Sequence, residues 1–132
     1  MARKRFPPDD PREWFNRARS NLVLAQETNP DVYREDNCFD AQQAAEKAIE
    51  AVFIHRGENF PYTHNLEDLL NRLQRNGLKV PKYVRKAHKL TRFASEARYP
   101  GASGPVSKRE HRHFVLIAEA VLHWSERQIG KP

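Results

Sequence analysis

The chain has 132 residues, of which 39% are hydrophobic and 30% are charged. This size suits one hydrophobic core, so we expect a single domain over residues 1–132, and the apolar content excludes the disordered class. One cysteine, Cys38, excludes an intrachain disulfide, and no stretch reaches the roughly 18 apolar residues that a membrane span needs. The basic start of the chain has no apolar region behind it, so we expect no secretory signal and a cytoplasmic protein.

The net charge of +6 is concentrated in one part of the chain. Between Lys82 and Arg112 there are nine Lys or Arg residues against two acidic ones, Glu96 and Glu110, so this segment alone carries +7. Such a cluster is the electrostatic pattern of a nucleic-acid or nucleotide surface. The alternative is an ordinary solvated helix face.

Two long helices are predicted in the first half, after a flexible basic N-terminus over residues 1–9. Asp10-Pro11-Arg12-Glu13 combines an N-cap acid with a proline at the first helical position, which predicts a helix running to about Glu27. A second helix is predicted from near Tyr33 to His55, with Gly57 as its stop. Its expected inner stripe is rich in small side chains, so neighbouring helices can approach closely: Phe39, Ala41, Ala45, Ala48, Ile49 and Val52.

Three further helices are predicted in the second half. The third has four leucines on its buried face and ends at Asn76-Gly77. The fourth begins at Pro81, and its spacing predicts an α-helical inner stripe of Val84, Ala87, Thr91, Ala94 and Ala97. A long loop over 99–106 leads to the capping box Ser107-Lys108-Arg109-Glu110, which opens a last helix that ends at Gly130. Because no segment alternates with period two, the expected fold class is all-α, an antiparallel up-and-down bundle of four to five helices.

Four ordered pieces of the chain, between Trp14 and Trp124, resemble the HEPN family, named for its occurrence in higher eukaryotes and prokaryotes. Residues 39–51 resemble the signature of its second helix, and 61–66, Pro-Tyr-Thr-His-Asn-Leu, resemble the segment before its third. Residues 97–100, Ala-Arg-Tyr-Pro, resemble the end of its fourth helix, and Trp14 and Ala18 match its first. The resemblance implies a helical bundle, often a homodimer, found beside a minimal nucleotidyltransferase.

The resemblance leaves the function open. Some family members are ribonuclease toxins with a nucleotidyltransferase antitoxin, whereas others are thought to bind nucleotides or RNA or to mediate assembly. HEPN ribonucleases carry an Arg and a His separated by four to six residues. No pair in this chain has that spacing, since Arg85 and His88 have two intervening residues and Arg109 and His113 have three. A standard HEPN ribonuclease is therefore disfavoured.

The candidate ligand-binding residues come from the basic fourth helix and from the parts of the chain that it is expected to meet: Arg98, Tyr99, His64, Lys47, Gln43, Arg85, Lys89 and Arg92. Each has a structural alternative. Arg98 could pair with Glu46, Tyr99 could anchor the loop, and His64 could pack and hydrogen-bond locally. Gln43 and Lys47 could serve a helix or dimer contact.

Two hypotheses about function follow, with a purely structural assembly role as a third. The leading one is a non-catalytic or weakly catalytic homodimer that binds nucleotide or RNA phosphates and acts with a minimal nucleotidyltransferase, in a toxin-antitoxin pair. The alternative is a metal-independent ribonuclease toxin that uses Arg98 with His64 or His111. We expect no metal and no cofactor, because no His lies at ligand spacing beside the Glu46 and Glu50 pair.

Overall fold

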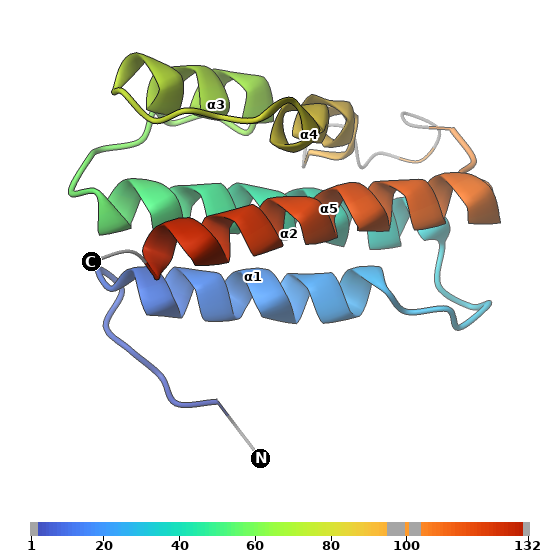
Figure 1. The fold of residues 1–132 in the computed structure, drawn as a ribbon. Coiled ribbons are helices and arrows are strands. Elements are labelled where there is room, and N and C mark those ends of the chain that lie inside the picture. Colours follow the sequence, from blue (N-terminus) through green and yellow to red (C-terminus); the bar gives the residue numbers. More distant parts are fainter. Residues whose placement is uncertain (1–2, 95–99, 101–103, 131–132) are drawn as a thin grey trace.

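Helices make up all the regular structure in the part of the chain that the computed structural model describes, residues 3–94, 100 and 104–130. They are α1 (Pro11–Ala25), α2 (Arg34–His55), α3 (Leu66–Arg75), α4 (Lys82–Arg85), the 3-10 helix η1 (Lys86–Phe93) and α5 (Lys108–Ile129) (Figure 1). The expected all-α class is confirmed. None of these helices is long and apolar enough to cross a bilayer.

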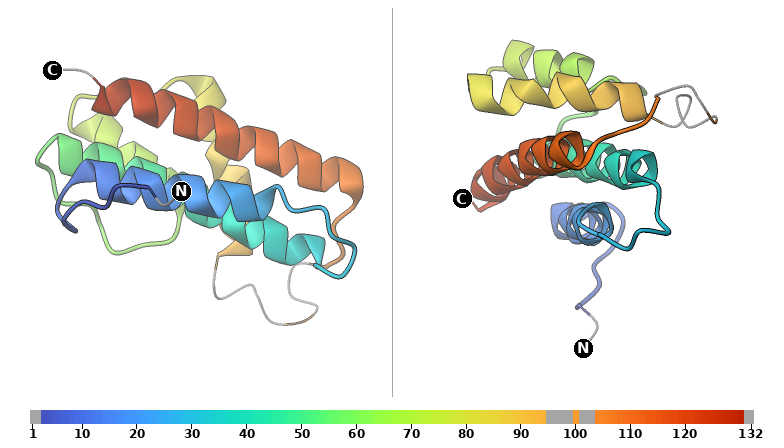
Figure 2. Two further views of the ribbon diagram at one scale, coloured as in Figure 1. Left: turned by 90° about the horizontal axis from the view of Figure 1, so that it is seen from below. Right: turned by 90° about the vertical axis from the view of Figure 1, so that its right-hand side faces the viewer.

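The helices lie in three layers. Two perpendicular views place α2 and α5 in the middle, α1 on one side, and α3 with α4 on the other (Figures 1 and 2). The first turns of α2 and α5 lie at the same end of the bundle, and α1 runs antiparallel to both (Figure 1). The loop after α1 therefore meets the start of α5 at that end.

The centre of the fold is α2, which packs against α1, α3, η1 and α5. Its five alanines between residues 41 and 51 are fully buried: Ala41, Ala44, Ala45, Ala48 and Ala51. Small side chains on several faces let neighbouring helices approach closely. Phe39, expected in this inner stripe, is only half-buried, whereas Cys38 beside it is buried, and burial raises the pKa of its thiol to about 12.

The predicted helix boundaries agree with the structure where they rest on capping chemistry. The Asp10 side chain accepts a hydrogen bond from Arg12 N at the start of α1. Ser107 and Glu110 form the expected capping box of α5. Gly57 follows α2 with φ of 70°, a left-handed conformation that glycine adopts without strain.

The expected α-helical form of the fourth helix is wrong beyond its first turn, although three residues of the expected inner stripe are buried, Val84, Ala87 and Ala94. The chain is α-helical only over Lys82–Arg85 and then continues as a 3-10 helix to Phe93. The buried residues recur at every third position, Val84, Ala87, Leu90 and Phe93, because a 3-10 helix has three residues per turn. Thr91, expected inside, is half-buried, and its Oγ1 accepts a hydrogen bond from Leu66 N at 3.2 Å. Ala97 lies outside the described residues.

This geometry makes Leu90 a core residue and leaves Lys89 on the surface. We expect Leu90→Ala to lower the free energy of unfolding by about 2–5 kcal/mol, since it removes a fully buried side chain. Lys89→Ala, one position away, should change it by less than about 0.5 kcal/mol. Urea denaturation of both variants tests this, and equal losses would contradict the 3-10 register.

Candidate functional site

The 3-10 geometry of η1 aligns three basic side chains on the surface. Residues three apart lie above one another in such a helix, so Lys86, Lys89 and Arg92 form one row with about 6 Å between successive members. All three are exposed, and none forms an ion pair with a carboxylate of the described residues. We call these three residues the cationic row.

Arg92, at the end of the cationic row, is held in place by aromatic rings. Its guanidinium carbon lies 4.6 Å from the centre of the Phe93 ring and 5.1 Å from that of Phe114. Such contacts restrict the side chain without using its N–H groups. The Glu110 carboxylate accepts a hydrogen bond from Ser107 N, which lowers the pKa of Glu110. The positive charge of Arg92 lowers this pKa further, by a smaller amount. The guanidinium is thus oriented and available to an anion.

A depression of about 480 Å³ lies beside Arg92. We call it the η1 depression, and its lining comes from the α2–α3 loop and the end of η1: Tyr62, Thr63, His64, Asn65, Thr91, Arg92 and Ala94. Tyr62 is fully exposed, and its ring centre lies 6.3 Å from that of His64. Two of the expected ligand-binding residues, His64 and Arg92, are therefore brought to one place.

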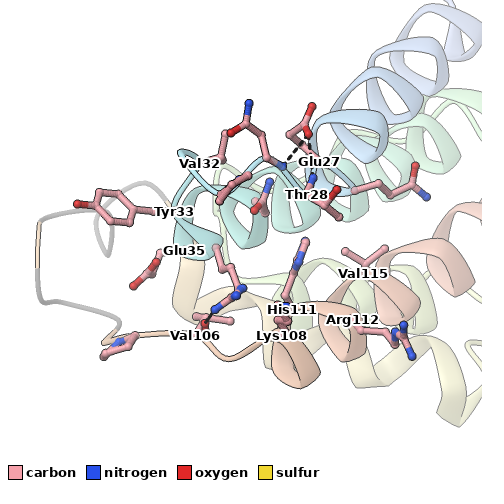
Figure 3. Close-up of a pocket in the computed structure, with 16 residues that line it drawn as sticks. Glu27, Thr28, Val32, Tyr33, Glu35, Val106, Lys108, His111, Arg112 and Val115 are labelled. Atoms are coloured by element: carbon pink, nitrogen blue, oxygen red, sulfur yellow. Dashed lines mark hydrogen bonds between the residues drawn. The ribbon is translucent and has the colours of Figure 1, made fainter.

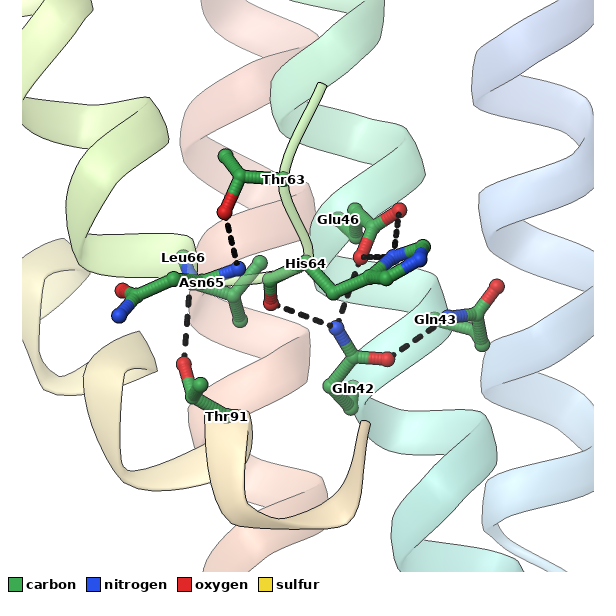
Figure 4. Close-up of polar contacts among 8 residues, drawn as sticks. All are labelled: Gln42, Gln43, Glu46, Thr63, His64, Asn65, Leu66 and Thr91. Atoms are coloured by element: carbon green, nitrogen blue, oxygen red, sulfur yellow. Dashed lines mark hydrogen bonds and ion pairs between the residues drawn. The ribbon is translucent and has the colours of Figure 1, made fainter. Parts of the chain in front are cut away.

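His64 is oriented by a buried carboxylate beneath the depression (Figure 4). Its Nδ1 lies 3.1 Å from Oε1 of Glu46, which is only 6% exposed. Gln42 Nε2 donates to the same Glu46 oxygen at 2.8 Å and to the carbonyl oxygen of His64 at 3.3 Å. Gln43 Nε2 in turn donates to Gln42 Oε1 at 2.7 Å. The amides thus fix the carboxylate, and the carboxylate fixes the imidazole, whose Nε2 has no partner among the described residues.

Other expected ligand-binding residues hold helices together. Lys47 Nζ donates to Asn21 Oδ1 at 2.7 Å, which joins α2 to α1, and burial lowers the pKa of Lys47. The Arg85 guanidinium donates to the side chains of Asn71 and Gln74, which joins α4 to α3. Arg98 and Tyr99 lie outside the described residues, as does half of the expected loop at 99–106.

His111 lies away from His64, in a second depression (Figure 3). This depression is formed by the loop between α1 and α2 and by the first turns of α5, and we call it the α5 cleft. Nε2 of His111 is 2.6 Å from the carbonyl oxygen of Ala25. His64 and His111 therefore belong to two separate places on the surface. In the part of the chain described, no three His, Cys, Asp or Glu side chains are grouped to hold a metal ion.

Sequence reasoning missed Tyr62 and the α5 cleft. Tyr62 stands in the segment 61–66 and is followed at once by Thr63 and His64, so an exposed aromatic beside a candidate His was a usable signal. The α5 cleft had no such signal, because its two sides are about 80 residues apart in the chain and meet only through packing.

Glu50 is a buried carboxylate one helical turn from Glu46, and burial raises its pKa to about 8. In the unfolded chain Glu50 releases its proton at lower pH than in the folded protein. The free energy of unfolding therefore falls as pH rises from about 4.5 to about 8. Glu50→Gln removes this loss. We compare the free energy of unfolding of the variant with that of the wild type. The difference should shift in favour of the variant by at least about 1.4 kcal/mol from pH 5 to pH 8.5, the value of one pKa unit.

Urea denaturation at these two pH values measures the gain. Glu67→Gln, at an exposed position in the first turn of α3, serves as the matched control and should show a difference that changes little with pH. If the stability difference between Glu50→Gln and the wild type also changed little with pH, the raised pKa of Glu50 would be contradicted.

Comparison with known proteins agrees with the fold and identifies the family. The sequence model of the HEPN domain family matches residues 11–128 of this chain. The solved structure of TT1696 from Thermus thermophilus is 31% identical with a TM-score of 0.78, over 89% of this chain and 97% of that one.

A second solved structure, ST0689, described as an archaeal HEPN homologue, has a TM-score of 0.73 at 21% identity, over 91% of this chain and 98% of that one, and shows the fold alone. No curated protein matches this chain. Because the match covers most of the sequence, the chain belongs to the HEPN domain family.

Proposed function

We propose that this HEPN protein binds the phosphates of a nucleotide or of single-stranded RNA along the cationic row and in the η1 depression. The observation that supports this most is the meeting of Arg92, His64 and the fully exposed Tyr62 at the end of a row of exposed cations. Among the described residues no carboxylate lies at ion-pair distance from Lys86, Lys89 or Arg92, and the ion pair in the depression is that of His64 with the buried Glu46.

Each element of this surface has a matching role in RNA binding. The Arg92 guanidinium presents a planar fork that suits two phosphate oxygens, whereas Lys86 and Lys89 supply point charges along the backbone. Tyr62 offers an aromatic face on which an unpaired base stacks. An exposed aromatic favours a single strand over a duplex, since the bases of a duplex are already stacked.

The partner is part of the proposal. We infer a homodimer that acts with a minimal nucleotidyltransferase, and this rests on the resemblance to the HEPN family. Exposed apolar residues on α1 and α5 give helix faces on which a second protein could pack: Val23, Leu24 and Leu116, with exposed fractions of 68%, 53% and 55%.

Replacing two cations of the row should weaken RNA binding more than replacing two elsewhere. We expect Lys89→Ala with Arg92→Ala to lower the affinity for a single-stranded oligoribonucleotide at least about tenfold at low salt. The slope of log K against log salt should fall by about 1.4, since about 0.7 of a counterion is released per contact. Arg75→Ala with Lys79→Ala removes the same charge from the end of α3 and the segment after it, and is the control. Fluorescence anisotropy measures both, and equal losses would contradict the proposal.

A specific geometry favours ribonuclease chemistry as a second candidate function. A carboxylate orients His64 through Nδ1, which leaves Nε2 for proton transfer, and Arg92 lines the same depression. In this arrangement His64 takes the proton of the RNA 2′-hydroxyl, whose oxygen bonds to phosphorus as the bond from phosphorus to the 5′-oxygen breaks. The 5′-oxygen takes a proton from solvent, and a 2′,3′-cyclic phosphate remains. Arg92, or Arg98 as first expected, holds the phosphate. His111 is less suited, because its Nε2 is engaged by the Ala25 carbonyl.

Expression in bacteria distinguishes catalysis from binding. If His64 is catalytic, the protein alone arrests growth and cleaves RNA in the presence of EDTA, and His64→Ala restores growth and abolishes cleavage. Co-expression of a neighbouring minimal nucleotidyltransferase should also restore growth and should co-purify with the protein. His88→Ala, an exposed His on η1, is the matched control and should change nothing. Equal cleavage by wild type and His64→Ala would reject His64 as the acid-base group.

A further inference from the structure

The α5 cleft, drawn in Figure 3, has a larger volume than the η1 depression and shares no lining residue with it. Its volume is about 930 Å³, at the upper end of the roughly 300–1,000 Å³ of small-molecule sites. Three valines give it an apolar interior, of which Val106 and Val115 are buried and Val32 is half-buried. An apolar ring or chain of a ligand can lose contact with water against them.

Charged groups surround this apolar interior, and cations are in excess. Arg34, Lys108 and Arg112 line the cleft against two acids, Glu27 and Glu35. The Glu27 carboxylate accepts hydrogen bonds from Thr28 N and Asn29 N, both at 2.9 Å, so its charge is directed to its own loop. Both α2 and α5 also begin here, and the positive ends of their dipoles add to the cationic character. The charges therefore favour an anionic group on the ligand.

Two hydrogen bonds cross the cleft and hold its sides together. Arg34 Nη1 donates to the carbonyl oxygen of Val106 at 3.1 Å, and His111 Nε2 donates to that of Ala25 at 2.6 Å. The Arg34 bond uses one of the five N–H donors of the guanidinium, so others remain for a ligand. Because these bridges tie the two sides together, the cleft is pre-formed, as small-molecule sites usually are.

We propose that the α5 cleft binds a small organic anion with an apolar or aromatic body, at a site independent of the cationic row. The body lies against Val32, Val106 and Val115, and the anionic group lies against Arg34, Lys108 and Arg112. This site does not depend on RNA binding, because the two depressions share no lining residue.

The dye 8-anilinonaphthalene-1-sulfonate has the required chemistry, an aromatic body with one sulfonate, and its fluorescence rises in an apolar site. We expect saturable binding of one dye per folded chain. N-phenyl-1-naphthylamine has the same body without the sulfonate and should bind at least about tenfold more weakly. The near-ultraviolet circular dichroism must stay that of the native protein, since the dye also binds partly unfolded states.

Two kinds of variant locate the dye. Lys108→Glu with Arg112→Glu should weaken binding at least about tenfold, and Thr28→Trp, at an exposed position on the rim, should block it without a change of charge. Lys86→Glu with Lys89→Glu makes the same charge change on the cationic row and should alter binding less than about threefold. In nuclear magnetic resonance spectra the dye should shift the amide signals of Val32, Val106 and Val115.

Three results would overturn the proposal. They are equal weakening by the two pairs of charge reversals, equal binding of the charged and uncharged dyes, and amide shifts confined to residues outside the cleft. Loss of oligoribonucleotide binding in the cationic-row variants, with dye binding intact, would separate this site from the proposed RNA surface.

Discussion

The close packing of α2 is the constraint on which the rest of the structure depends. Its buried alanines allow α1, α5 and η1 to approach the same helix, so α2 contacts its partner in the middle layer and both outer layers. A larger side chain at any of these positions would push a neighbouring layer outward, since interiors packed this tightly have no room for added atoms. Both depressions on the surface are formed by segments whose separation this packing sets.

The position of η1 over α2 explains why the chain leaves the α-helical form after Arg85. Apolar residues at every third position are all buried only if the helix has three residues per turn, and burial of Leu90 and Phe93 outweighs the poorer hydrogen bonds of the 3-10 form. The same winding aligns the cationic row along a neighbouring face, about 120° around the helix from the buried one. A structural requirement of the core thereby produces the straight row of positive charge.

Buried polar groups on α2 link the core to the surface. Glu46 is nearly covered, yet its oxygens are satisfied by Gln42 and His64, so its charge is stabilised where an unpaired one would be costly. For Glu50, one turn away, burial and then the charge of Glu46 raise the pKa and favour its protonated form. Two carboxylates on one helix thus differ, because one has hydrogen-bond donors and the other is mainly desolvated.

Sequence alone determined the fold class, the capped helix ends at Asp10 and Ser107, the small-residue core of α2 and the basic character of the segment from Lys82 to Arg112. These features follow from local chemistry, since caps, helical periodicity and charge are properties of neighbouring residues. Only the tertiary structure decided that η1 is a 3-10 helix, that Lys47 and Arg85 join helices, and that His64 lies with Arg92. The α5 cleft also depends on the tertiary structure, because packing against α2 brings together segments that are far apart in the sequence.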